Sequence, residues 1–255
     1  MKLKLLFTSL LLTAGLNLGV LAEDTASISG TIKLEGKAKK EKPIRMGADQ
    51  VCAASHKGTV LTRHYVLGPN NELANAFVYI KSGLTKKYPA PKEPVIMDQV
   101  NCLYVPYVMG VQTGQILKVK NSDPTMHNVN CAAVNNKKFN IGQPQKGMEN
   151  DVTFDKQEVM VKFKCDVHPW MFGYVGVVEH PFFATTDEEG TYSFDGLPAG
   201  EYEVEVWHNK CGTSTQKISV KDGEAKTLDF AVSRKTAKSK GAASTTAPAT
   251  PAAAH

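Results

Sequence analysis

Val159-Met160-Val161-Lys162-Phe163-Lys164-Cys165-Asp166-Val167-His168-Pro169-Trp170-Met171 is the stretch of sequence that decides the fold. Its first part, residues 159–163, is rich in β-branched and aromatic residues, which is typical of a β-strand. Its second part is a short loop that carries a thiol, an imidazole and a thioether within seven residues. A strand that runs directly into such a loop predicts a β-protein that holds a metal ion on short loops.

A second imidazole comes from His127, within the run NSDPTMHN at residues 121–128. Two imidazoles, one cysteine thiolate and a weak axial methionine form the ligand set of a blue copper electron-transfer site. We therefore predict that one type 1 copper ion is bound by His127, Cys165, His168 and Met171. Zinc held by two imidazoles and a thiolate is one alternative, and a related fold without any metal is another.

Strand signals of the same kind recur along the chain, and clusters of Gly, Pro, Asn and Asp separate them. No segment has a convincing long helical period, so the sequence predicts an all-β, sandwich-like class. Residues 36–72 are less regular, and a short helix is expected near Ala48 to Ala54. The other strand signals lie at residues 27–34, 76–80, 116–120, 174–178, 201–207 and 217–220.

The part from residue 94 to residue 180 resembles a cupredoxin of the amicyanin or plastocyanin type. Its motifs follow the family's order, from the N-x-D-x-x-x-H-N run to a C-x-x-H-x-x-M ligand loop with amicyanin-like spacing. The resemblance implies a Greek-key β-sandwich in which Asn128 ties the two ligand loops together by hydrogen bonds. It also implies that the edge of His168 is exposed within an apolar patch, and that a redox protein docks there, near Pro169 and Trp170.

A second resemblance is to the carboxypeptidase regulatory-like, or transthyretin-like, β-sandwich. The runs DEEGTYSF at 187–194 and GLPAGEY at 196–202 are similar to that family's pattern, but the family's opening strands lie far upstream, before residue 83. This spacing predicts a split sandwich, residues 23–83 plus 181–232, with the cupredoxin domain, residues 84–180, inserted into it. Three consecutive small domains are the alternative.

The two ends of the chain differ from its body in composition. Residues 1–22 have a basic start, an apolar stretch and a small-residue end, so a cleaved signal peptide is expected, with a retained anchor as the alternative. No other segment is long and apolar enough to span a membrane. Residues 233–255 are rich in Ala, Thr, Pro, Ser and Lys, which predicts a disordered tail. The protein is therefore expected in the periplasm or elsewhere in the cell envelope.

The basic excess belongs to the ends as well. The chain has 30 Lys and Arg against 25 Asp and Glu, but two of the basic residues lie in the leader and four in the tail. The remaining body is close to neutral, so the charge does not indicate nucleic-acid binding.

Five cysteines are an odd number for an exported protein. If Cys165 binds the metal, the other four can pair in an oxidising compartment. We expect the pairs Cys52–Cys102 and Cys131–Cys211, and the other pairings of these four cysteines stay open.

Catalytic motifs are missing from the sequence: it has no G-x-S-x-G, no H-E-x-x-H and no phosphate-binding glycine loop. The regulatory-like resemblance is to an accessory domain without hydrolytic residues. We therefore expect a protein that is not an enzyme and that carries single electrons between redox partners. The alternatives are a copper-delivery protein without redox turnover and a structural module of the cell envelope.

Overall fold

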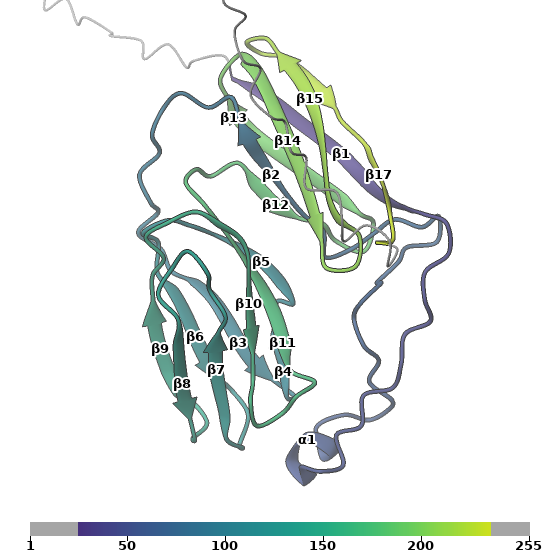
Figure 1. Ribbon diagram of the computed structural model, residues 1–255, viewed down its shortest axis with the longest axis vertical. Helices are drawn as coiled ribbons and strands as arrows, with labels where there is room; N and C mark the ends of the chain where they lie inside the picture. The colour runs from purple at the N-terminus through teal and green to yellow at the C-terminus, as the bar shows by residue number, and fades with distance from the viewer. Residues whose placement is uncertain (1–24, 236–255) are drawn as a thin grey trace, which may run out of the picture.

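Two β-sandwiches lie end to end in the computed structural model, which describes residues 25–235 (Figure 1). The predicted all-β class is confirmed, because the described residues form many strands and one short helix. The predicted signal peptide, residues 1–22, lies outside the described residues, as does most of the predicted tail, residues 233–255. Within residues 25–235, no helix has both the length and the apolar character needed to cross a bilayer.

The inserted sandwich comprises residues 95–178. Its strands are β3 (Val95–Val100), β4 (Leu103–Val105), β5 (Val108–Gln112), β6 (Leu117–Asn121), β7 (His127–Cys131), β8 (Phe139–Gln143), β9 (Glu149–Val152), β10 (Glu158–Lys164) and β11 (Phe172–Val178). One sheet has the strand order β5-β11-β10-β7-β8, and the other has the order β4-β3-β6-β9. Side chains alternate between the two faces of a strand, so Val161 and Phe163 of β10 are buried while Lys162 is exposed.

The outer sandwich is built from the two ends of the described chain. Its strands are β1 (Ala26–Glu35), β2 (Phe77–Ser82), β12 (Phe183–Thr185), β13 (Thr191–Leu197), β14 (Gly200–His208), β15 (Gly212–Val220), β16 (Ala225–Thr227) and β17 (Phe230–Ser233). One sheet has the order β13-β1-β16, with β17 also pairing with β1, and the other has the order β12-β2-β14-β15. Its core is a cluster of buried apolar side chains that includes Ile32, Val78 and Val204.

Strand pairing in the outer sandwich joins the segment before the inserted sandwich to the segment after it. β1 pairs with β13, and β2 pairs with both β12 and β14. Neither β1 nor β2 could complete a sheet without the strands that return after residue 180. On the strength of this pairing we propose the domain limits expected from the sequence, residues 23–83 plus 181–232 around residues 84–180.

Two glycines, which we name the glycine floor, lie where the two sandwiches pack against each other. Gly110 in β5 and Gly176 in β11 are cross-strand neighbours. A Cβ atom at Gly176 would come within 2.5 Å of the ring of Phe77, and one at Gly110 would come within 2.3 Å of the ring of Phe183. Both rings belong to strands of the outer sandwich, so the bare backbone of the two glycines lets the sandwiches pack directly against each other.

β1 and β2 are joined by a long connection that runs to the inserted sandwich, and we name its residues 43–61 the cap (Figure 1). The cap contains α1 (Gln50–Ala54), which agrees with the short helix expected near Ala48 to Ala54. Asp49 caps the helix, because its side chain accepts hydrogen bonds from the first free backbone N–H groups. Met46 and Cys52 are buried in the core of the inserted sandwich, so the cap is packed onto that sandwich.

Substitution of a glycine in the glycine floor tests how tightly the two sandwiches pack against each other. We expect Gly176→Ala to lower the free energy of unfolding by about 1–3 kcal/mol, the usual cost of forcing an extra methyl group into a packed core. The measurement is a urea titration followed by fluorescence and circular dichroism. Gly142→Ala in β8 is the matched control, because a Cβ atom there meets nothing within 4 Å. Equal stability of the two variants would contradict the tight junction.

Candidate metal centre

The predicted ligands lie at one end of the inserted sandwich, at the start of β7 and on the loop that joins β10 to β11. His127 begins β7, and Cys165 directly follows β10, which pairs with β7. The loop from Cys165 to Met171 then leads into β11. Two backbone hydrogen bonds close this loop, from Cys165 N–H to Met171 O (3.0 Å) and from Met171 N–H to His168 O (2.8 Å).

The donor atoms of three predicted ligands converge. Nδ1 of His127 lies 3.0 Å from Nδ1 of His168, and Sγ of Cys165 lies 3.9 Å from Nδ1 of His168. One donor atom from each of the three residues lies within 4.8 Å of the others. The side chain of Met171 is fully buried in the core cluster that also contains Cys165. The arrangement brings together two imidazoles and a thiol on segments that also carry a buried thioether, and this donor set suits copper.

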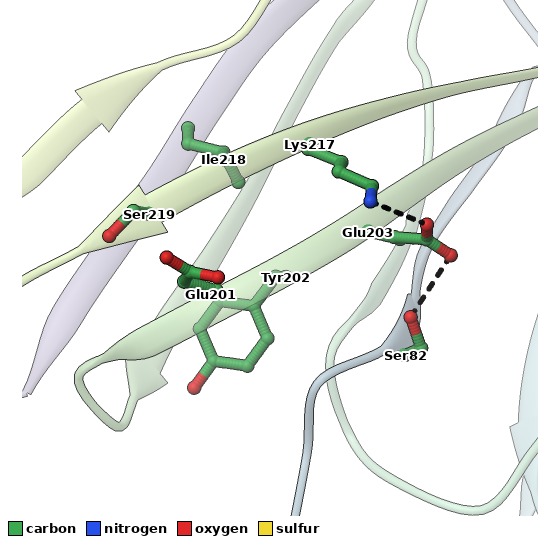
Figure 2. Close-up of a pocket in the computed structure, with 7 residues that line it drawn as sticks. All are labelled: Ser82, Glu201, Tyr202, Glu203, Lys217, Ile218 and Ser219. Atoms are coloured by element: carbon green, nitrogen blue, oxygen red, sulfur yellow. Dashed lines mark hydrogen bonds and ion pairs between the residues drawn. The ribbon is translucent and has the colours of Figure 1, made fainter.

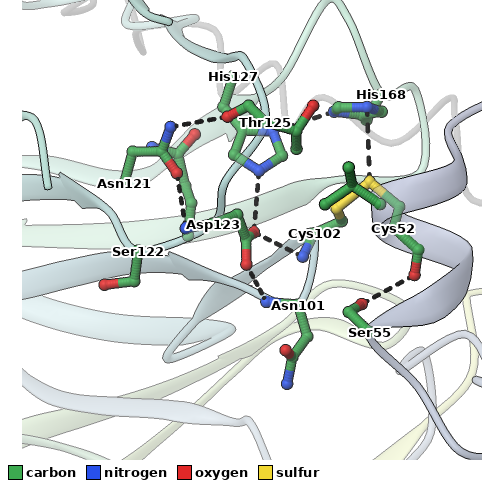
Figure 3. A network of polar contacts seen from close by, with 12 residues as sticks. Cys52, Ser55, Asn101, Cys102, Asn121, Ser122, Asp123, Thr125, His127 and His168 are labelled. Carbon is green, nitrogen blue, oxygen red and sulfur yellow. Dashed lines mark hydrogen bonds and ion pairs between the residues drawn. A yellow bond between two sulfur atoms is a disulfide. The ribbon is translucent and has the colours of Figure 1, made fainter. Parts of the chain in front are cut away.

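A carboxylate anchors the outer nitrogen of each imidazole. Nε2 of His127 is 2.9 Å from Oδ2 of Asp123, and Nε2 of His168 is 3.0 Å from Oδ2 of Asp49. Donation of Nε2–H to a carboxylate leaves the Nδ1 lone pair for a metal and fixes the orientation of the ring. Figure 3 shows His127 above Asp123, and the same carboxylate accepts backbone hydrogen bonds from Asn101 and Cys102.

The electrostatics of the site favour a thiolate at Cys165. Burial alone would raise the pKa of Cys165, but hydrogen bonds from His127 and from nearby backbone N–H groups, including that of Asn128, bring it below its ordinary value. Burial alone would lower the pKa of His127, but Asp123 and Cys165 outweigh burial and raise it to about 9. The thiolate is the form of cysteine that binds metals.

Asn128 lies between the two ligand-bearing segments. Its Oδ1 accepts a hydrogen bond from the backbone N–H of Asp166 (2.6 Å) and one from Sγ of Cys165 (3.4 Å). Its Nδ2 donates to the carboxylate of Asp166 (3.0 Å) and to Oδ1 of Asn140 (2.6 Å). Asn128, the residue after His127, therefore holds in place the loop that carries the other three predicted ligands.

The cap covers the side of the site that was expected to be open. His168 is only 2% exposed, so the expected exposed histidine edge is wrong. The physical reason is that the Cys52–Cys102 disulfide fixes the cap over the imidazole, with Sγ of Cys52 3.6 Å from Nε2 of His168 (Figure 3). Trp170 packs against the imidazole, with ring centroids 5.1 Å apart, while Pro169 is exposed.

The disulfide prediction is correct for one pair and wrong for the other. Cys52 and Cys102 are bonded, whereas Cys131 and Cys211 are free. Cys131 is buried in the core of the inserted sandwich, and Cys211 packs against the core of the outer sandwich. Because the two thiols belong to separate cores, they do not pair.

The two carboxylates that contact the imidazoles, Asp123 and Asp49, were not predicted from the sequence. Asp123 carries a usable signal, since it precedes His127 by four residues within the N-x-D-x-x-x-H-N run. Asp49 carries none, because only the path of the cap brings it beside His168.

The outer sandwich has a shallow cleft on its β14–β15 side (Figure 2). Glu203 is paired there with Lys217 at 3.7 Å and accepts a hydrogen bond from Ser82 at 3.1 Å. Its lining residues include no histidine or cysteine. These groups satisfy one another, and we assign the cleft no role.

Comparison with known family models matches one of the two sequence resemblances. Residues 176–233 match the family model of the carboxypeptidase regulatory-like domain, which confirms that resemblance for the returning strands of the outer sandwich. No protein with a curated description matches the chain.

Cupredoxins are among the similar solved structures. A purple cupredoxin from Nitrosopumilus maritimus is 26% identical over 33% of this chain and 97% of its own, with a TM-score of 0.28. A Cu(I) amicyanin variant is 20% identical over 39% and 97%, with a TM-score of 0.30. A Cu-containing nitrite reductase from Thermus scotoductus SA-01 is 21% identical over 38% of this chain, with a TM-score of 0.33. The present chain spans only 25% of that reductase.

The cysteine arrangement can be tested by thiol counting. Under denaturing, non-reducing conditions we expect one reactive thiol for each of Cys131, Cys165 and Cys211 and none from the bonded pair. Replacing Cys52 and Cys102 together by serine should lower the free energy of unfolding by roughly 3–5 kcal/mol, as for other long disulfide loops. Cys211→Ser is the control and should remove one reactive thiol without affecting the disulfide. Five reactive thiols, or only one, would contradict the structure.

Proposed function

We propose that the protein is an exported type 1 copper protein that carries single electrons between redox partners in the cell envelope. The observation that carries this proposal is the convergence of one ring nitrogen of His127, one of His168 and Sγ of Cys165 within 4.8 Å, in a buried site whose ligand loop also carries buried Met171. Two imidazoles, a thiolate and a thioether suit both oxidation states of copper, because the set combines soft and intermediate donors.

Each ligand has a distinct role in this proposal. His127 and His168 would bind through Nδ1, Cys165 would bind as a thiolate, and Met171 would be a long axial ligand that helps to set the reduction potential. Copper held in this way supplies a one-electron couple. The lowered pKa of Cys165 supports the thiolate role, because it favours the deprotonated form that binds metals.

The surroundings of the site support electron transfer rather than chemistry on a substrate. Asn128, Asp123 and Asp49 bond to the ligands or to their loop, so the ligands are held before any metal arrives. A centre whose ligands move little between oxidation states exchanges electrons with little reorganisation. The groups of potential metal ligands found among residues 25–235 all contain His127 or His168, so we propose a single centre and no enzymatic activity.

We propose that a redox partner docks on apolar side chains around the cap rather than on His168 itself. Val51, Met126 and Val167 are 37%, 48% and 46% exposed. Each is the chain neighbour of a residue in or against the site, namely Cys52, His127 or His168. Exposed Pro169 extends this surface. Apolar surface of this kind marks interaction sites, and a small interface lets a carrier release its partner quickly.

Copper delivery without redox turnover is the competing function. A delivery protein must give up its metal, and His168 is enclosed by a cap that a disulfide holds in place. This enclosure favours the electron carrier. The same disulfide supports the proposed export, because such bonds persist in oxidising compartments.

Addition of Cu(II) tests the function directly. We expect the chain without its leader, residues 23–255, to develop an intense visible thiolate-to-copper band and an EPR spectrum with small hyperfine splitting. Cys165→Ser should abolish both, because it removes the thiolate.

Cys131→Ser is the matched control, since Cys131 is an equally buried thiol of the same core that is absent from the proposed ligand set. It should keep the visible band. A pale spectrum that does not depend on Cys165 would rule out the type 1 centre.

A further inference from the structure

The cap brings a carboxylate from outside the inserted sandwich to the outer face of a proposed copper ligand. Oδ2 of Asp49 lies 3.0 Å from Nε2 of His168. The hydroxyl of Thr125 donates to the same oxygen, also at 3.0 Å. Asp123 makes the equivalent contact with His127, but Asp123 belongs to the inserted sandwich. Asp49 belongs to the connection between the first two strands of the outer sandwich.

We propose that Asp49 is a positioning residue for His168, through which the cap orients this ligand and lowers the reduction potential of the copper centre. This inference rests on the proposed function. It adds a role for the outer sandwich, because the cap, which lies between two strands of that sandwich, would set the reduction potential of the metal site.

Both oxygens of Asp49 are engaged, so the carboxylate has one orientation. Oδ1 accepts hydrogen bonds from the backbone N–H groups of Val51 (2.8 Å) and Cys52 (3.1 Å), and Oδ2 faces His168. Both oxygens act as hydrogen-bond acceptors, which is the role of an ionised carboxylate.

The cap is held firmly enough for this contact to persist. The Cys52–Cys102 disulfide bonds it to the inserted sandwich, and Met46 is buried in the same core. Backbone N–H of Ile44 donates to the carbonyl of Val60 at 2.8 Å, which closes the base of the cap.

The effect on His168 follows from the chemistry of imidazole. A hydrogen bond from Nε2–H to an anion fixes the tautomer that leaves the Nδ1 lone pair for the metal, and it makes the ring a stronger donor. A stronger donor and a nearby negative charge both favour Cu(II) over Cu(I), which lowers the potential. The cap also keeps water from His168, which is 2% exposed.

Two substitutions separate this role from the capping of α1. Asparagine and serine are both good N-caps, so Asp49→Asn and Asp49→Ser should keep the helix. Asparagine removes the negative charge. The shorter serine side chain no longer reaches Nε2 of His168, so the hydrogen bond to the imidazole is lost. We expect each variant to shift the Cu(II)/Cu(I) equilibrium towards Cu(I) by about tenfold, which is about 59 mV for a one-electron couple. Asp151→Asn is the control: this carboxylate of the inserted sandwich pairs with Lys118 at 3.0 Å, and its replacement should leave the potential unchanged.

The second measurement does not need copper. Imidazole ¹⁵N NMR of the metal-free protein should report a single Nε2–H tautomer for His168 in the wild type and a mixture in both Asp49 variants. Releasing the cap by replacing Cys52 and Cys102 together with serine should give the same mixture.

Potentials of the Asp49 variants equal to that of the wild type would overturn the inference, as would an unchanged His168 tautomer. Failure of the proposed function has a different signature, because the wild type would then lack the blue spectrum while the NMR contact between Asp49 and His168 could still be measured.

Discussion

The antiparallel pairing of β7 with β10 is the interaction on which the rest of the site depends. Its register places Phe163 opposite Cys131, so the chain leaves β10 with Cys165 on the buried face, two residues after Phe163. A slip of one residue would turn Cys165 outward, because neighbouring side chains of a strand point to opposite faces. The same pairing sets the start of β7, and with it His127, beside the loop.

Enclosure of the site comes from a different part of the chain. The cap lies on the connection between β1 and β2 of the outer sandwich, and it is packed on the inserted sandwich through Cys52 and Met46. The glycine floor brings Phe77 and Phe183 of the outer sandwich onto β5 and β11. The inserted sandwich is thus in contact with the outer part of the chain both at its junction and at its metal end.

The sequence predicted what is local and missed what depends on the path of the cap. The alternation of β10 and the seven-residue ligand loop lie together in the sequence, so the β-fold and three candidate ligands could be found there, while His127 came from its own local run at residues 121–128. The contact of Asp49 with His168 joins residues 119 positions apart, and no local pattern carries that information. The expected exposure of His168 was wrong for the same reason. The pairing of Cys131 with Cys211 was wrong because counting cysteines does not reveal which core each one joins.

The disulfide between the cap and the inserted sandwich also limits how this protein can be divided in evolution. A gene fragment for residues 84–180 would encode all four proposed ligands, but it would leave Cys102 without its partner and His168 without its cover. Domain shuffling ordinarily moves an insertion by its two linkers, yet this insertion has a third, covalent attachment. The two sandwiches are therefore expected to be inherited together, as one unit rather than as exchangeable modules.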